Sequence, residues 1–146
     1  VRTILENGAD PAALFADAKA TERTVEECLR ISAPVHIFQR YALEDVELDG
    51  IQFRRGDKVA MILAAANLDP KKFSDPLTFK PDRDEGANLS FGAGIHFCIG
   101  APLARLELNI ALPILFQRLP GLKIAKAPVV KDVYHFHGLE ALELTW

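Results

Sequence analysis

One segment constrains the fold of this chain more than any other, the ten residues Phe91–Gly100. A single cysteine, Cys98, lies there among glycines, and a helix-like segment from Ala101 to Leu119 follows directly. Glycine lets the backbone adopt positive φ and approach a flat ligand closely, and the dipole of a helix that begins beside a thiolate stabilises it. The segment therefore predicts a loop that presents one sulfur in a fixed place. A single protein thiolate leaves the rest of a metal's coordination sphere open, which suits a haem iron.

The spacing of this loop resembles the haem-binding signature of the cytochromes P450, Phe-Gly-x-Gly-x-His-x-Cys-x-Gly. The positions that match around the cysteine are Phe91, Gly92, Gly94, His96 and Gly100. The continuation, residues 101–107, is similar to the bacterial members. The resemblance implies that Cys98 is the axial ligand of haem b, iron protoporphyrin IX, and that Phe91 packs beside the sulfur and keeps water away. The alternative is a glycine loop that holds a buried structural thiol.

The resemblance covers only the C-terminal part of a cytochrome P450. We therefore expect residues 1–146 to be the haem-ligating part of that domain, without its N-terminal part and its distal helix. The implied fold class is mainly α with small antiparallel β-sheets, that is, α+β within this chain. Composition agrees with a globular core, because 49% of the 146 residues are hydrophobic and 25% are charged.

Charge and cysteine usage exclude several classes of protein. The net charge of −3 gives no reason to expect nucleic-acid binding. No apolar run reaches the ~20 residues of a membrane span. The two cysteines, Cys28 and Cys98, form no disulfide framework, which fits a reducing cytoplasm. We read Cys28 as a small buried hydrophobic residue.

Local patterns predict an order of elements along the chain. Asp10-Pro11 predicts a helix start, and Thr21 predicts the N-cap of a second helix that ends near Ile31. Asp49-Gly50 predicts a hairpin turn. The expected strands are 35–41, 46–53, 59–63, 122–124, 129–136 and 142–146, with an ordered meander at 69–88. Leu103, Leu106, Ile110 and Ile114 predict the apolar face of the helix after Cys98, and Pro113 should kink that helix.

Glu27 and Arg30 stand three residues apart on the second predicted helix, so they share a face. Spacing alone indicates a surface ion pair worth less than ~1 kcal/mol. The pair lies upstream of the cysteine loop, Phe91–Gly100. In that position it resembles the Glu-x-x-Arg motif of the cytochromes P450, in which a later arginine joins the pair. The segment Phe79–Arg83 resembles that later motif, which makes Arg83 the implied third member. The implied role of the three is to support the cysteine loop.

The resemblance also implies that Arg40 and His96 bind the haem propionates. From the residues alone, an isolated strand arginine such as Arg40 is a solvated charge. Three roles stay open for Arg105: contact with a propionate, contact with a redox partner, or a solvated side chain with neither contact. His135 and His137 indicate strand packing rather than a metal site, because no further ligand stands at zinc spacing.

The function that the resemblance implies is that of a soluble bacterial haem-thiolate monooxygenase, which uses O₂ and two electrons to oxidise a small organic substrate. The implied partners are a ferredoxin-type or flavoprotein electron donor and that substrate, which residues 33–37 could face. Three alternatives stay open. The chain could be a catalytically inert, truncated fragment that self-associates, a peroxide-using haem hydroxylase, or a haem-thiolate sensor without turnover.

Overall fold

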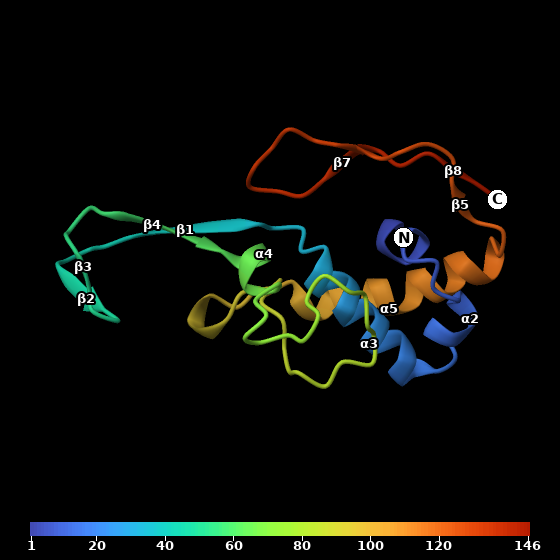
Figure 1. Cartoon of the computed structure of the whole chain (residues 1–146), viewed down its shortest axis with the longest axis horizontal. Coiled ribbons are helices and arrows are strands. Elements are labelled where there is room, and N and C mark those ends of the chain that lie inside the picture. The colour runs from blue at the N-terminus through green and yellow to red at the C-terminus, as the bar shows by residue number, and fades with distance from the viewer.

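The computed structural model describes all residues, 1–146. Two long helices form its centre, α3 (Ala18–Ile31) and α5 (Ala101–Arg118), and they pack side by side (Figure 1). The shorter helical elements are α1 (Arg2–Glu6), α2 (Pro11–Leu14), α4 (Leu63–Ala66) and the 3₁₀-helix η1 (Gly94–His96). None of the helices is long and apolar enough to cross a bilayer.

All strands pair in antiparallel twos. The pairs are β1 (Ile37–Tyr41) with β4 (Lys58–Ile62), β2 (Val46–Leu48) with β3 (Ile51–Phe53), β5 (Lys123–Ile124) with β8 (Leu144–Thr145), and β6 (Val129–Val130) with β7 (Leu139–Ala141). The β1–β4 and β2–β3 pairs form one arm that extends away from the helices, and the C-terminal strands form another (Figure 1). The predicted class, mainly α with small antiparallel sheets, is confirmed.

The core consists of two small clusters, and α5 contributes to both. One cluster is formed by Ile4, Phe116 and Leu122, and the other by Val25, Leu29 and Leu112. These contacts fix α5 against α1 and α3. Because the cysteine loop leads directly into α5, the same clusters fix where the loop begins and ends.

The helix α3, which the sequence analysis places between Thr21 and Ile31, begins earlier than predicted. Its N-cap is Asp17, whose side chain accepts a hydrogen bond from the Ala20 amide at 2.8 Å. Thr21, the predicted cap, lies buried inside the helix, and its hydroxyl donates to the Asp17 carbonyl. Asp and Thr are both good caps, and the prediction for Thr21 was wrong because Asp17 caps the first turn.

The helix after Cys98 continues through Pro113 as predicted in extent, but its buried side differs from the prediction. Leu112 and Phe116 face the core. The predicted apolar face is exposed to solvent, and its members are Leu103, Leu106, Ile110 and Ile114. This helix carries apolar residues on almost every side, so its periodicity does not single out one face.

Two further differences concern the ends of the chain. The helix α1 was not predicted. The strand expected over 129–136 stops at Val130, because the Lys131 amide donates a hydrogen bond to the Gly138 carbonyl and closes a loop.

The hairpin turn at Asp49-Gly50 is confirmed, with Leu48 paired to Ile51.

Candidate functional site

Backbone hydrogen bonds close the cysteine loop, Phe91–Gly100. The Cys98 amide donates to the Phe91 carbonyl at 2.9 Å, and the Phe97 amide donates to the Gly94 carbonyl at 3.1 Å. The Ala101 amide then donates to the Cys98 carbonyl at 3.1 Å, where α5 begins. The sulfur therefore lies at the start of a helix on a closed loop. Cys98 is exposed, which excludes the alternative of a buried structural thiol.

The glycines of the loop serve different purposes. Gly92 and Gly94 have φ of +72° and +66°, which other L residues rarely adopt. Gly100 has φ of −81° and needs no special freedom. A Cβ at Gly100 would lie 3.8 Å from the Cys98 sulfur, so glycine keeps that side of the sulfur uncovered.

The surface around the sulfur is apolar. Ile95 and Ile99 are almost fully exposed, and Phe97 is half exposed. Apolar side chains of this size are seldom left open together without a ligand or partner to cover them. A thiol set in such a surface fits a broad, flat and largely apolar group with a metal at its centre, and haem is such a group.

Phe91 lies between the two central helices. Its ring packs against the cluster of Val25, Leu29 and Leu112. The guanidinium carbon of Arg105 lies 4.7 Å from the centre of the same ring. The sequence leaves three roles open for Arg105. In the structure Arg105 pairs with Glu26 of α3, with Nε 2.5 Å from Oε1. The hydrogen bonds that Arg105 donates to Glu26 raise the pKa of Arg105 above its ordinary value.

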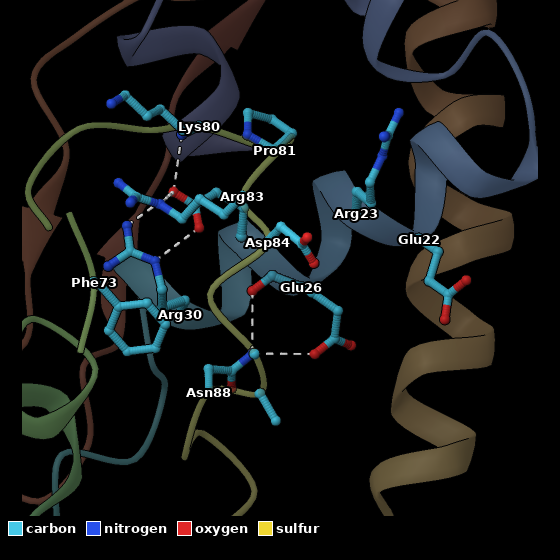
Figure 2. Close-up of a pocket in the computed structure, with 13 residues that line it drawn as sticks. Glu22, Arg23, Glu26, Arg30, Phe73, Lys80, Pro81, Arg83, Asp84 and Asn88 are labelled. Atoms are coloured by element: carbon cyan, nitrogen blue, oxygen red, sulfur yellow. Dashed lines mark hydrogen bonds and ion pairs between the residues drawn. The ribbon is translucent and has the colours of Figure 1, made fainter. Parts of the chain in front are cut away.

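The structure brings Glu27, Arg30 and Arg83 together through two ion pairs. Figure 2 shows Arg30 and Arg83 close to each other between α3 and the meander. Arg30 donates to both Glu27 oxygens, at 2.7 and 2.8 Å, and Arg83 donates to Oε1 at 3.0 Å. Glu27 and Arg30 are only 4% and 3% exposed. Spacing alone predicts an ion pair on the surface, and that prediction is wrong because the network is buried.

The remaining donors of the two arginines bind backbone carbonyls of the meander and of Asn67, which lies just before it. Arg30 donates to the carbonyls of Asn67 and Pro76 at 2.8 and 2.9 Å. Arg83 donates to the Asp75 and Thr78 carbonyls at 2.8 and 2.7 Å. The network thus replaces regular secondary structure as the partner of these backbone carbonyls. It holds the predicted meander against α3.

An ion pair at the edge of the network extends it to Glu85. Its Oε2 accepts from Arg83 at 3.0 Å, and its Oε1 accepts from the Ser74 amide, also at 3.0 Å. Hydrogen bonds from Ser74, and then from Arg83, lower the pKa of Glu85 to about 2. A polar cavity of about 360 Å³ adjoins this region, between α3 and the meander (Figure 2).

Sequence reasoning missed the residues that fix the entry to the cysteine loop. The buried Asn67 accepts from the Leu89 amide at 2.6 Å and donates to the Ser90 hydroxyl at 2.9 Å. Ser90 in turn donates to the Leu29 carbonyl of α3 at 2.6 Å. Asn67 is the C-cap of the short helix α4, and nothing in its spacing along the sequence points to Ser90.

Arg40 and His96, which the resemblance assigns to the haem propionates, lie on different elements and do not contact each other. Arg40 lies exposed on β1, where it donates to the Gln39 carbonyl and has no carboxylate partner. His96 ends η1 within the cysteine loop and is also exposed. Both side chains are therefore free to bind an anionic group.

The remaining sequence candidates lie away from the cysteine loop. His137 stacks on His36 with ring centres 4.9 Å apart, while His135 packs against Tyr134. No group of three or more His, Cys, Asp or Glu side chains is placed to hold a metal ion. Cys28 is partly buried beside the cluster of Ile4, and burial raises the pKa of its thiol to about 11.

Comparison with known proteins agrees with this geometry. The family model described as cytochrome P450 matches residues 2–132. The cytochrome P450 monooxygenase PikC of Streptomyces venezuelae is 44% identical over 139 residues, which is 92% of this chain and 33% of that protein. The 6-deoxyerythronolide B hydroxylase of Saccharopolyspora erythraea is 46% identical over 130 residues, 89% of this chain and 29% of that protein.

Solved structures show the same fold. P450BioI, in complex with an acyl carrier protein ligated to hexadec-9Z-enoic acid, matches with a TM-score of 0.93 and 36% identity. The match covers 99% of this chain and 38% of that one. CYP164A2 of Mycobacterium smegmatis matches with a TM-score of 0.92 and 36% identity, over 99% of this chain and 36% of its own. This chain thus spans about a third of the length of its curated relatives, and it belongs to the cytochrome P450 family.

Proposed function

We propose that the protein containing this chain is a haem-thiolate monooxygenase and that Cys98 would hold the iron of its haem b. The observation that carries the proposal is the exposed sulfur on a closed glycine loop at the start of α5, in a chain of this family. Bound haem would supply the oxygen-activating redox chemistry, with two electrons from a ferredoxin-type or flavoprotein donor. The substrate would be a small organic molecule, and the location the cytoplasm.

Each of the site residues has a distinct proposed task. Cys98 binds the iron as a thiolate. Arg40 and His96 donate to the two propionates, since a cation or an N–H group without a carboxylate partner suits a carboxylate ligand. Phe91 limits the access of water to the sulfur. The glycines that keep the loop closed and the sulfur open on one side are Gly92, Gly94 and Gly100.

The buried network has a proposed structural role. Arg30 and Arg83, both held by the Glu27 carboxylate, donate to four backbone carbonyls of residues 67–78 at distances of 2.7 to 2.9 Å. Such directional bonds hold a long segment without a sheet or helix. We assign the three residues to support of the cysteine loop from behind, and none of them to proton transfer.

Names of relatives support the reaction class. One relative is named as a hydroxylase of 6-deoxyerythronolide B and another as a monooxygenase. Both names fit insertion of oxygen into an organic substrate. We propose that reaction class for this protein without naming its substrate.

The test is replacement of Cys98 by Ser and by His in the haem-bound protein that contains this chain. We expect both variants to lose the thiolate-type spectrum of the reduced CO complex, because neither side chain supplies a sulfur donor. Cys28→Ser is the matched control, and its spectrum should be unchanged. A thiolate-type spectrum in Cys98→Ser or Cys98→His would contradict the assignment.

A second proposal concerns the 146-residue chain on its own, and it rests on the exposed side of α5. Leu103, Leu106, Ile110 and Ile114 are between 43% and 60% exposed, so water meets a continuous apolar stripe. We expect this chain to self-associate and to lack turnover. A sizing column and a turnover assay test it, and a monomer with haem and activity would contradict it.

A further inference from the structure

Arg105 and Glu26 join the two central helices at the level of the cysteine loop. Nε of Arg105 donates to Oε1 of Glu26 at 2.5 Å, and Nη2 donates to Oε2 at 3.0 Å. Both donors point at one carboxylate, so the guanidinium plane is fixed and not only its charge. The two side chains are 31% and 32% exposed, so the contact is partly shielded from solvent.

The fixed guanidinium lies over the ring of Phe91, with its carbon 4.7 Å from the ring centre. The same ring packs against Val25, Leu29 and Leu112. Phe91 thus contacts both an apolar cluster and a cation, and partial desolvation strengthens the contact with the cation. Its backbone carbonyl accepts the hydrogen bond of the Cys98 amide at 2.9 Å. A displacement of Phe91 therefore reaches the residue that carries the sulfur.

The same carboxylate also binds the chain just before the loop. Nδ2 of Asn88 donates to Oε2 of Glu26 at 3.1 Å, a contact that Figure 2 shows, and Oδ1 of Asn88 accepts from the Ser90 amide at 3.0 Å. Glu26 thus contacts the segment before the loop through Asn88 and the helix after it through Arg105. Glu27 points instead to the buried network, so the adjacent carboxylates serve separate segments.

We propose that Glu26 and Arg105 are positioning residues for the Cys98 sulfur, which act by holding Phe91 and both ends of the cysteine loop. The proposal deepens the function proposed above, because it takes Cys98 to be the haem ligand. Neither residue touches the sulfur or the haem in this role. They determine how rigidly the thiolate is held and how far water approaches it, and both properties affect the potential of the iron.

The decisive measurement is hydrogen exchange of the Cys98 amide in the haem-bound protein, by NMR or by mass spectrometry. We expect exchange about two- to fivefold faster in both Arg105→Gln and Glu26→Gln, the scale of a partly exposed ion pair. The double variant should be no faster than either single variant, since the two side chains act as one unit. Arg105→Lys should resemble Arg105→Gln, because an ammonium group cannot replace the planar fork.

Two matched controls separate positioning from charge. Arg118→Gln removes a cation from the far end of α5, and Glu22→Gln removes an anion one turn before Glu26 on α3. Neither should change exchange of the Cys98 amide. The reduction potential adds a second test. A pure charge effect moves it in opposite directions in Arg105→Gln and Glu26→Gln and leaves exchange unchanged.

Unchanged exchange in both single variants would overturn the proposal, as would equal acceleration in the controls. Failure of the proposed function is a separate result, because it shows itself in Cys98→Ser as a retained thiolate-type spectrum. The exchange measurement still decides in that case, because the hydrogen bond from Cys98 to Phe91 does not depend on what the sulfur binds.

Discussion

The Glu27 carboxylate accepts two hydrogen bonds from Arg30, at 2.7 and 2.8 Å, within a single turn of α3. Both side chains are almost completely shielded from water. At this spacing on an exposed helix the pair would contribute little to stability. Here both charges are buried and have lost their hydration. Each is stabilised instead by its attraction to the other.

Removal of the carboxylate charge should therefore destabilise the protein strongly. We expect Glu27→Gln to lower the free energy of unfolding by about 3–5 kcal/mol, because it leaves the buried Arg30 guanidinium without a counter-charge. Chemical denaturation measures this loss. The matched control is Glu6→Gln, which breaks an exposed pair with Arg2 and should cost less than ~1 kcal/mol. Equal losses in the two variants would contradict a buried structural network.

This contrast shows what the sequence can and cannot predict. The spacing of Glu27 and Arg30 placed the two residues on one face, and the structure agrees. The same spacing gave no information on burial, which depends on residues 67–83 folding over α3. The resemblance to a family, rather than the spacing, indicated that Arg83 joins them.

The cysteine loop was predictable because its geometry is local. Glycines at positions 92 and 94 have the positive φ expected of them, and the helix begins where expected. The contacts that anchor the loop were not predictable. Asn67 and Ser90 are 23 residues apart, and Glu26 and Arg105 are 79 apart. Only the packing of α3 against α5 brings such partners together.

The two kinds of loop glycine should respond differently to alanine. Gly92→Ala and Gly94→Ala each place a Cβ on a residue with positive φ, which costs about 1–2 kcal/mol. Gly100→Ala keeps φ in its ordinary region and should cost less backbone strain. Denaturation of the three variants measures the difference. A loss in Gly100→Ala as large as in Gly94→Ala would contradict this assignment of backbone strain.

The proposed propionate contacts predict weaker haem retention when a donor is lost. We expect Arg40→Leu to release haem about tenfold faster or more, the scale of a hydrogen bond to a charged group. His96→Leu should act in the same direction, and the thiolate-type CO spectrum should persist in both. Transfer of haem to an excess of apomyoglobin measures the rate. Arg54→Leu, on the same arm of the molecule, is the control and should leave the rate unchanged.

Should neither Arg40→Leu nor His96→Leu change the rate, the two residues do not hold the propionates. An equal increase in the Arg54→Leu control would also count against them. It would show that the arm responds to any loss of positive charge.

The contact between His137 and His36 predicts a dependence of stability on pH. Desolvation first, and then the nearby His36 and Arg2, lower the pKa of His137. The unfolded chain binds a proton near the ordinary value of about 6.5, whereas the folded chain binds it only at lower pH. Stability from this contact is thus complete above about pH 6.5 and is lost as the pH falls through the lower folded value.

Urea denaturation at about pH 5 and about pH 8 measures the effect. We expect His137→Gln to lose part of the wild-type dependence on pH, while His135→Gln, which alters a contact with Tyr134 instead, retains it. Identical pH dependence in the wild type and His137→Gln would show that the charge on His137 does not affect folding.

The last prediction uses the different settings of the two cysteines. Burial raises the pKa of the Cys28 thiol to about 11, so at about pH 8 only about one thiol in a thousand is the reactive thiolate. Cys98 is exposed at the start of α5. In the haem-free protein we therefore expect iodoacetamide to modify Cys98 and to leave Cys28 unmodified, as judged by mass spectrometry.

Addition of haem should protect Cys98 from alkylation and leave Cys28 unchanged, because coordination occupies the sulfur that would attack the reagent. Cys28→Ser should show the same protection, and unchanged alkylation of Cys98 in the presence of haem would count against its role as the ligand.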